Sequence, residues 1–174
     1  MKYIVKIFVV TFFLIFSTQA FAEQKIVVLD LTYVLNSSKA GKGAQDFLKE
    51  KFNDNNKKHS ELEKSLKKEE NDLLETRADL TAEEYKQKAD ELRKKVVDYQ
   101  NERRASLDKL ATQRANARKI LMEKLKPIVD SYIKENEIAL VIDKKNMLGG
   151  SSKYDITELI VEKLNKELPS IDLK

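Results

Sequence analysis

The sequence predicts a mainly α-helical fold, in which a long antiparallel helical hairpin, coiled-coil-like, projects as an arm from a small body of short strands and helices. Three observations predict it. Residues 44–126 contain neither glycine nor proline, although the chain of 174 residues has four glycines and two prolines. Charged residues make up 36% of the chain and aromatic residues only 7%. Apolar side chains also recur at alternating spacings of four and three. A compact domain rarely permits so long a helical run, whereas a projecting arm requires it.

The first 22 residues have the pattern of a secretory signal peptide. Lys2 and Lys6 supply positive charge, residues 7–16 form an uninterrupted apolar run, and residues 20–22 (Ala-Phe-Ala) have the small-x-small form of a cleavage site. We therefore expect cleavage before Glu23, and no lipid attachment because no cysteine follows the site. The alternative is an uncleaved membrane anchor, but the apolar run is shorter than the ~20 residues that a membrane span needs.

Composition limits the kinds of site that the mature chain can hold. It has no cysteine and one histidine, which excludes a disulfide scaffold, a cysteine nucleophile and a zinc site built from several such ligands. No glycine-rich phosphate-binding loop is present, so ATP use is not expected. We expect no cofactor. Residues 23–174 carry 31 basic and 29 acidic groups, a net charge of +2. Export without cysteine predicts a bacterial periplasm, and both compartment and charge argue against nucleic acid as a partner.

The body is predicted from two flanks, residues 23–43 and 127–174, which the glycines and prolines separate from the arm at 44–126. Each flank contains an apolar, β-branched segment that predicts a buried strand, Lys25–Leu31 in the first and Ile138–Ile142 in the second. We also expect a helix capped by Ser37 or Ser38 and a short third strand near Met147–Gly150. A final helix should begin with Asp155 and Glu158 as a capping box and end at Pro169. Its apolar stripe would consist of Leu159, Ile160, Val161 and Leu164.

The arm is predicted to consist of two helices with a weak, partly polar seam. Between them, Thr81 and Glu84 have capping-box spacing, and Leu80 and Tyr85 have the spacing of a hydrophobic staple. This places the turn near residues 78–82, although one continuous helix is the alternative. A strict coiled coil would have more Leu and Ile at the seam. The seam positions are Phe52, Asn55, His59, Leu62, Leu66, Glu69, Leu73, Thr76 and Leu80, then Tyr85, Ala89, Leu92, Val96, Tyr99, Arg103, Ser106, Leu110, Gln113, Ala117 and Ile120.

The predicted body is too small to bury much apolar surface alone, because the two flanks total only 69 residues. Its short strands also have open edges, which invite pairing with another chain. We therefore expect a closed homo-oligomer in which strands from several copies complete one sheet or barrel. The arms would then surround a space that holds an unfolded chain without fitting one sequence. The body residues expected in this assembly are Ile26, Val28, Ile138, Leu140 and Ile142.

Charge is uneven along the arm. Residues 44–80 carry 8 basic and 10 acidic groups, whereas residues 93–126 carry 11 basic and 4 acidic groups. The simpler interpretation is a solvated helix face with i,i+4 ion pairs. The sharper interpretation is a patch that attracts acidic clients or anionic lipid headgroups. The candidate contacts are Arg93, Lys94, Lys95, Arg103 and Arg104.

Catalysis has almost no support in the sequence. The single histidine, His59, falls on the arm seam, where a packed or solvated helix residue is expected. The paired acids Glu69 and Glu70, and Glu83 and Glu84, lie on highly charged helices that offer no pocket to raise a pKa. We therefore predict that the protein is not an enzyme.

Four segments of the C-terminal third follow one another in a recognisable order: Arg118–Leu121, Lys126–Ile128, Ile138–Lys144 and Tyr154–Thr157. With the order of the other features, they resemble the Skp/OmpH family of periplasmic chaperones, most strongly over residues 118–165. The resemblance implies a homotrimer with a small β-barrel body and three tentacle-like hairpins. It also implies an ATP-independent holdase that keeps outer-membrane protein precursors soluble. In some members it implies lipopolysaccharide binding, for which the region of Arg103 and Arg104 is our candidate.

Two other functions are compatible with a helical arm. One is a structural periplasmic coiled-coil spacer or envelope adaptor that binds one folded partner, for which a regular heptad seam is expected. The other is a membrane-surface protein that uses residues 93–126. The holdase is the preferred prediction because the seam is irregular and partly polar.

Overall fold

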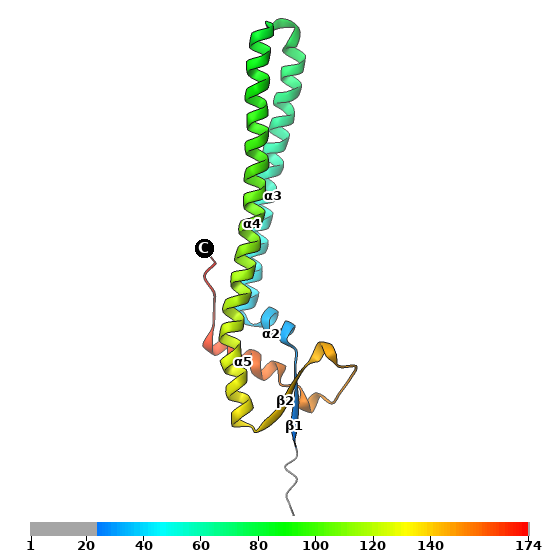
Figure 1. The fold of residues 1–174 in the computed structure, drawn as a ribbon, viewed down its shortest axis with the longest axis vertical. Helices are drawn as coiled ribbons and strands as arrows, with labels where there is room; N and C mark the ends of the chain where they lie inside the picture. The colour runs from blue at the N-terminus through cyan, green and yellow to red at the C-terminus, as the bar shows by residue number, and fades with distance from the viewer. Residues whose placement is uncertain (1–23, 174) are drawn as a thin grey trace, which may run out of the picture.

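The computed structural model describes residues 24–173, and the predicted signal peptide lies outside them. A long two-helix arm rises from a small body that contains the strands (Figure 1). Helix α3 spans Lys39–Glu75 and helix α4 spans Ala82–Glu135, joined by a 3-10 turn at Thr76–Asp79. At a rise of 1.5 Å per residue the helices are about 55 and 80 Å long. The predicted fold class, mainly helical with a long hairpin arm and a small β body, is confirmed.

The turn of the hairpin is built as its sequence predicts. The side chain of Thr81 accepts a hydrogen bond from the Glu84 backbone N–H, and the Glu84 carboxylate accepts one from the Thr81 N–H at 2.9 Å. This reciprocal pair satisfies two N–H groups at the start of α4 that have no partner within the helix. The capping box is confirmed, and the alternative of one continuous helix is wrong.

The two arm helices pack along the predicted seam. His59, Leu66, Leu73 and Ala117 are buried between them. Of the twenty predicted seam positions, only Phe52, Thr76 and Arg103 are exposed, and the rest are buried or half-buried. Periodicity of 3.6 residues is therefore sufficient to identify the facing sides of both helices, even where the seam side chains are polar.

The body contains a parallel two-stranded sheet, β1 (Lys25–Leu29) and β2 (Ile138–Asp143). Helices α2 (Leu31–Ser37) and α5 (Thr157–Glu167) and the lower end of α4 pack together beside it (Figure 1). The largest fully buried apolar side chains of this core are Val34, Leu125, Ile160 and Leu164.

The expected third strand is absent from residues 24–173. Lys144–Asn146 and Ser152–Tyr154 form 3-10 turns instead, and only an isolated bridge joins Val28 to Asp155. The first strand is also shorter than predicted, because the Asp30 carboxylate accepts a hydrogen bond of 2.8 Å from the Tyr33 N–H and starts helix α2. An N-cap residue thus outweighs the apolar run that continues past it.

The start of the final helix differs from the predicted capping box. Asp155 accepts a hydrogen bond of 3.0 Å from the Thr157 N–H, and Ile156 occupies the N-cap position. The Glu158 carboxylate instead accepts a hydrogen bond from the Tyr33 hydroxyl, which raises the pKa of this tyrosine. A tertiary contact therefore replaces the local one. The other predicted cap is confirmed, since the Ser38 hydroxyl accepts a hydrogen bond of 3.2 Å from the N–H of Gly41, the third residue of α3.

Breaker residues do not end the arm helices where the sequence pattern suggests. Pro127 lies inside α4, which continues to Glu135 because Leu125, Ile128 and Val129 pack into the body core. Gly41 lies in the first turn of α3, where an added Cβ would be 1.9 Å from the carbonyl oxygen of Leu35. Glycine at this position therefore allows α3 to approach α2 closely.

Candidate functional site

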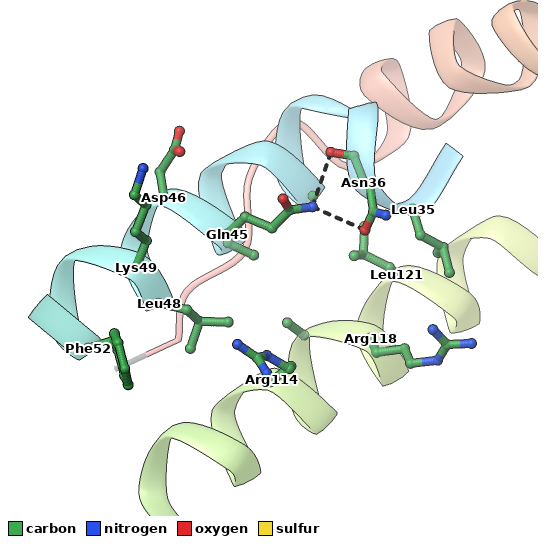
Figure 2. Close-up of a pocket in the computed structure, with 13 residues that line it drawn as sticks. Leu35, Asn36, Gln45, Asp46, Leu48, Lys49, Phe52, Arg114, Arg118 and Leu121 are labelled. Carbon is green, nitrogen blue, oxygen red and sulfur yellow. Dashed lines mark hydrogen bonds between the residues drawn. The ribbon is translucent and has the colours of Figure 1, made fainter. Parts of the chain in front are cut away.

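An open groove lies where the arm helices enter the body, and we call it the root groove. Its volume is about 710 Å³. Figure 2 shows that side chains from α3 and α4 face one another across it. The apolar floor of the groove is formed by Leu35, Ala44, Leu48, Ala117 and Leu121. The remainder is lined by Asn36, Gln45, Asp46, Lys49, Phe52, Arg114 and Arg118.

The root groove combines apolar surface with positive charge. Phe52 is 46% exposed although it occupies a predicted seam position. Arg114 and Arg118 are one helical turn apart on α4, and neither forms an ion pair with another residue of the described chain. The Gln45 amide is already engaged, because it donates to the side-chain oxygen of Asn36 at 3.0 Å (Figure 2). The groove can therefore accept an apolar segment that carries an acidic group.

A second shallow depression lies near the end of the arm, and we call it the upper groove. Its volume is about 640 Å³, and it is open to solvent along the helix pair. Leu74 and Val97, which contribute to it, are 54% and 53% exposed. The other lining residues include Glu63, Lys67, Glu70, Tyr85, Leu92, Arg93 and Val96. Exposed apolar side chains thus lie among charges of both signs.

The five basic residues predicted as contacts do not gather into one patch. Arg93 pairs with Asp90 at 2.7 Å, and Lys95 pairs across the arm with Glu69 at 2.6 Å. At about 100° per residue, Arg93 and Arg104 share a face of α4. Lys94, Lys95 and Arg103 point in other directions around the same helix. Lys94, Arg103 and Arg104 are exposed and form no ion pair within residues 24–173.

The predicted oligomer residues lie on the small sheet. Ile26 is aligned with Leu140, and Val28 with Ile142, in adjacent strands. Ile26 and Leu140 are 43% and 52% exposed, Ile142 is half-buried, and Val28 is buried. Ile138, at the start of β2, is also buried.

The edges of the sheet differ in how they are covered. The Ile156 N–H donates to the Val28 carbonyl at 2.9 Å and so covers part of the outer edge of β1. No strand among the described residues pairs with the outer edge of β2. The sheet therefore presents both an open edge and two aligned, exposed apolar side chains.

The perturbed ionisable groups have structural causes. Lys58 and Glu102 form an ion pair across the arm, and the hydrogen bond from Lys58 lowers the pKa of Glu102. The hydrogen bond to Asp155 raises the pKa of Lys144. Burial acts to raise the pKa of Asp155, but hydrogen bonds from Lys144 and Thr157 outweigh it and lower that pKa. These groups stabilise the arm and a body loop, and none of them lines the grooves.

The single histidine belongs to the packing of the arm. His59 is 6% exposed, and its ring meets that of Tyr99 edge to face, with 5.9 Å between centroids. Within residues 24–173, no three His, Cys, Asp or Glu side chains gather as potential metal ligands. In the same part of the chain, no helix is long and apolar enough to cross a membrane.

Comparisons with known proteins agree with this architecture, a helical hairpin on a small mixed body. Residues 25–164 match the family model for outer membrane protein (OmpH-like), and the chain belongs to this family. A Skp-like protein from Pseudomonas aeruginosa is 26% identical over 151 residues, which cover 84% of this chain and 88% of the relative. The crystal structure of a protein described as an OmpH-like outer membrane chaperone from Caulobacter crescentus has a TM-score of 0.78, with 16% identity, and covers 90% of this chain and 92% of that chain.

The family predicted from the sequence is confirmed, but two features were not anticipated. One is the root groove, which the small residues Gly41, Ala44 and Ala117 could have indicated in the sequence. The other is the segment after α5, in which Ile171 and Leu173 pack against the arm. Alternating apolar residues after Pro169 could have indicated it.

Proposed function

We propose that the protein is an ATP-independent periplasmic holdase chaperone, which binds unfolded outer-membrane proteins between its arms and prevents their aggregation. The observation that carries this proposal is the open, mixed surface of the upper groove, where exposed Leu74 and Val97 lie among charges of both signs. Strands of membrane β-barrels alternate apolar and polar residues. A shallow surface with both kinds of contact suits many such segments and selects no single sequence. Membership of the OmpH-like family supports the chaperone role.

The proposed working form is a homotrimer. Its body would comprise residues 23–43 and 127–174, and residues 44–126 would form each arm. The exposed pair Ile26 and Leu140 and the unpaired edge of β2 supply an apolar, hydrogen-bonding surface for another copy. A closed ring of copies would place the arms around a shared space, so that a client contacts several of them at once.

The competing function is a periplasmic spacer or adaptor that binds one folded partner. Its arm would need a stiff, regular seam and a specific contact surface. The seam of this arm is instead interrupted by polar side chains, which favours the holdase. They are the buried His59 and the half-buried Asn55, Glu69 and Gln113.

The test is aggregation of an unfolded outer-membrane β-barrel protein, followed by light scattering without ATP. The mature chain, residues 23–174, should suppress it, and a variant that lacks residues 50–115 should not. Leu74→Ser with Val97→Ser should weaken suppression, whereas Lys86→Ser, an exposed control on the same arm, should not. No suppression at several-fold molar excess would contradict the holdase. Selective capture of one native protein together with indifference to unfolded clients would favour the spacer.

We also propose that Arg103 and Arg104 of α4 contact anionic lipid, including lipopolysaccharide. Arg103 and Arg104 carry this proposal, because they are exposed and not neutralised by an ion pair. Co-sedimentation should be stronger with vesicles that contain anionic lipid than with zwitterionic vesicles, and should fall with salt. Arg103→Gln with Arg104→Gln should reduce it. Binding that ignores lipid charge and salt would contradict the proposal.

A further inference from the structure

The chain continues after α5 as a short tail, residues 168–173, outside the 25–164 range that matches the family model. It has no regular secondary structure and rises beside α4 toward the arm (Figure 1). Leu173 is 7% exposed and packs against Ala44, Leu48 and Ala117 of the two arm helices. Ile171 packs against the same cluster and against the body core. The tail therefore occupies a surface formed by both arm helices.

We propose that this surface, the tail site, binds extended peptide segments in which apolar and polar residues alternate, and that the tail is its intramolecular ligand. The tail site consists of Ala44, Phe47, Leu48, Leu110, Gln113 and Ala117. The inference rests on the proposed holdase function, since it identifies one place where the arm recognises a client.

The contacts made by the tail define the class of ligand. Ile171 and Leu173 are two residues apart and both contact the arm, while Asp172 between them is exposed. Side chains at i and i+2 lie on the same side of an extended chain. The Gln113 amide donates a hydrogen bond to the backbone carbonyl of Leu173. Every peptide offers such a carbonyl, so the site recognises the alternating pattern and not a particular sequence.

The surface beside the tail leaves room for a longer ligand. A cleft of about 290 Å³ adjoins Leu173 and is lined by α4 residues, including Asn116, Lys119 and Ile120. Ala44, Leu48 and Ala117 belong to both the tail site and the root groove. A client segment that replaced the tail would therefore lie close to the second apolar surface at the root of the arm.

A tethered ligand weakens competing ligands by a predictable factor. The apparent dissociation constant is the intrinsic one divided by the fraction of molecules whose site is open. If the tail occupies its site in about nine molecules of ten, its release should tighten peptide binding about tenfold.

The experiment compares the mature chain with a variant that lacks residues 169–174 and with the full-length double variant Ile171→Ser, Leu173→Ser. Ser170→Ala, an exposed change in the same tail, is the matched control. The probe is a fluorescein-labelled peptide of residues 167–174, with a second peptide that has serine at 171 and 173. Fluorescence anisotropy should give about tenfold tighter binding of the first peptide to both tail variants than to the mature chain or the control. The serine peptide should not bind.

Equal binding of the peptide to all four proteins, or binding to none, would overturn the inference. Unfolding of the tail variants, followed by circular dichroism, would also overturn it, because a ligand that clients displace cannot be essential to the fold. Aggregation assays on the same proteins separate this inference from the proposed function. Holdase activity without peptide binding contradicts the tail site alone, whereas loss of both in the mature chain contradicts the holdase.

Discussion

The imidazole Nε2 of His59 on α3 lies 3.4 Å from the hydroxyl of Ser106 on α4, in the middle of the arm. The other ring nitrogen, Nδ1, is buried and has no hydrogen-bond partner among residues 24–173. A buried polar atom without a partner costs about 1–3 kcal/mol. The arm therefore contains a weak point where a strict coiled coil would have leucine or isoleucine.

Replacing His59 with leucine should stabilise the arm. The variant fills the seam with an apolar side chain and removes the unpaired nitrogen, so the free energy of unfolding should rise by about 1 kcal/mol. Hydrogen exchange of arm amides and denaturant unfolding both measure this. Ser106→Ala, which removes only the partner hydroxyl, should not stabilise the protein. A lower unfolding free energy for His59→Leu would show that the imidazole is better accommodated than its contacts indicate.

Acid should loosen the tip of the arm through Glu84. Hydrogen bonds from the Thr81 side chain and backbone lower the pKa of Glu84 from its usual value of 4.5. Its contribution is therefore fully present above pH 4.5 and is lost as pH falls through the lower pKa of the folded state. Protection factors of amides 82–88, corrected for intrinsic exchange, should fall in that range. In Glu84→Ala the carboxylate that accepts from Thr81 is absent, so protection should be lower already at neutral pH and should change little with acid.

Much of the arm could be predicted from the sequence because its determinants are local. Helical spacing identifies the seam, and the Thr81 and Glu84 pair identifies the start of α4. The body depends on contacts between distant segments, which spacing cannot reveal. Pro127 remains helical because neighbouring residues pack into the core, and Glu158 interacts with Tyr33 of α2 instead of completing the expected cap.

The candidate surfaces were harder to predict than the fold. The basic residues 93–95 and 103–104 are clustered in sequence, yet a helix distributes consecutive side chains around its axis. Two of them are also neutralised by Asp90 and Glu69. The root groove is lined by the small residues Gly41, Ala44 and Ala117, and three such residues far apart in the sequence are only a weak signal. Neither the distribution of the basic residues nor the root groove could therefore be predicted without the three-dimensional arrangement of the helices.

The junction between α4 and β2 contains a strained residue. Glu137 has a φ of 53°, in the left-handed region, directly after the C-cap Asn136. A residue with a side chain pays about 1–2 kcal/mol to adopt this conformation, and glycine avoids that penalty. Glycine instead loses about 0.5–1 kcal/mol of backbone entropy on folding. Glu137→Gly should therefore raise the free energy of unfolding by about 0.5 kcal/mol. Lys124→Gly, an exposed change well inside α4, should lower it by about 1 kcal/mol. Denaturant unfolding measures the change in unfolding free energy for both variants. If both substitutions lowered it, the backbone at Glu137 would not be strained.

The aligned side chains of Ile26 and Leu140 provide the sharpest test of assembly. They lie side by side on the two strands, about half exposed, next to an unpaired strand edge. In the proposed homotrimer another copy covers them, so a carboxylate at either position would be buried without a partner and disfavour association. Ile26→Asp and Leu140→Asp should therefore reduce the molar mass in light scattering from a trimer to a monomer. Circular dichroism should retain the helical signal of the arm.

Leu107 on α4 is the matched control, because it is 48% exposed but lies on the arm and away from the sheet. Leu107→Asp should leave the molar mass of the trimer unchanged. A Leu140→Asp variant with the mass of the unmodified protein would mean that the sheet is not the interface. If the unmodified protein were itself a monomer, the shared space between arms would be lost, and client binding would have to rest on the grooves of a single arm.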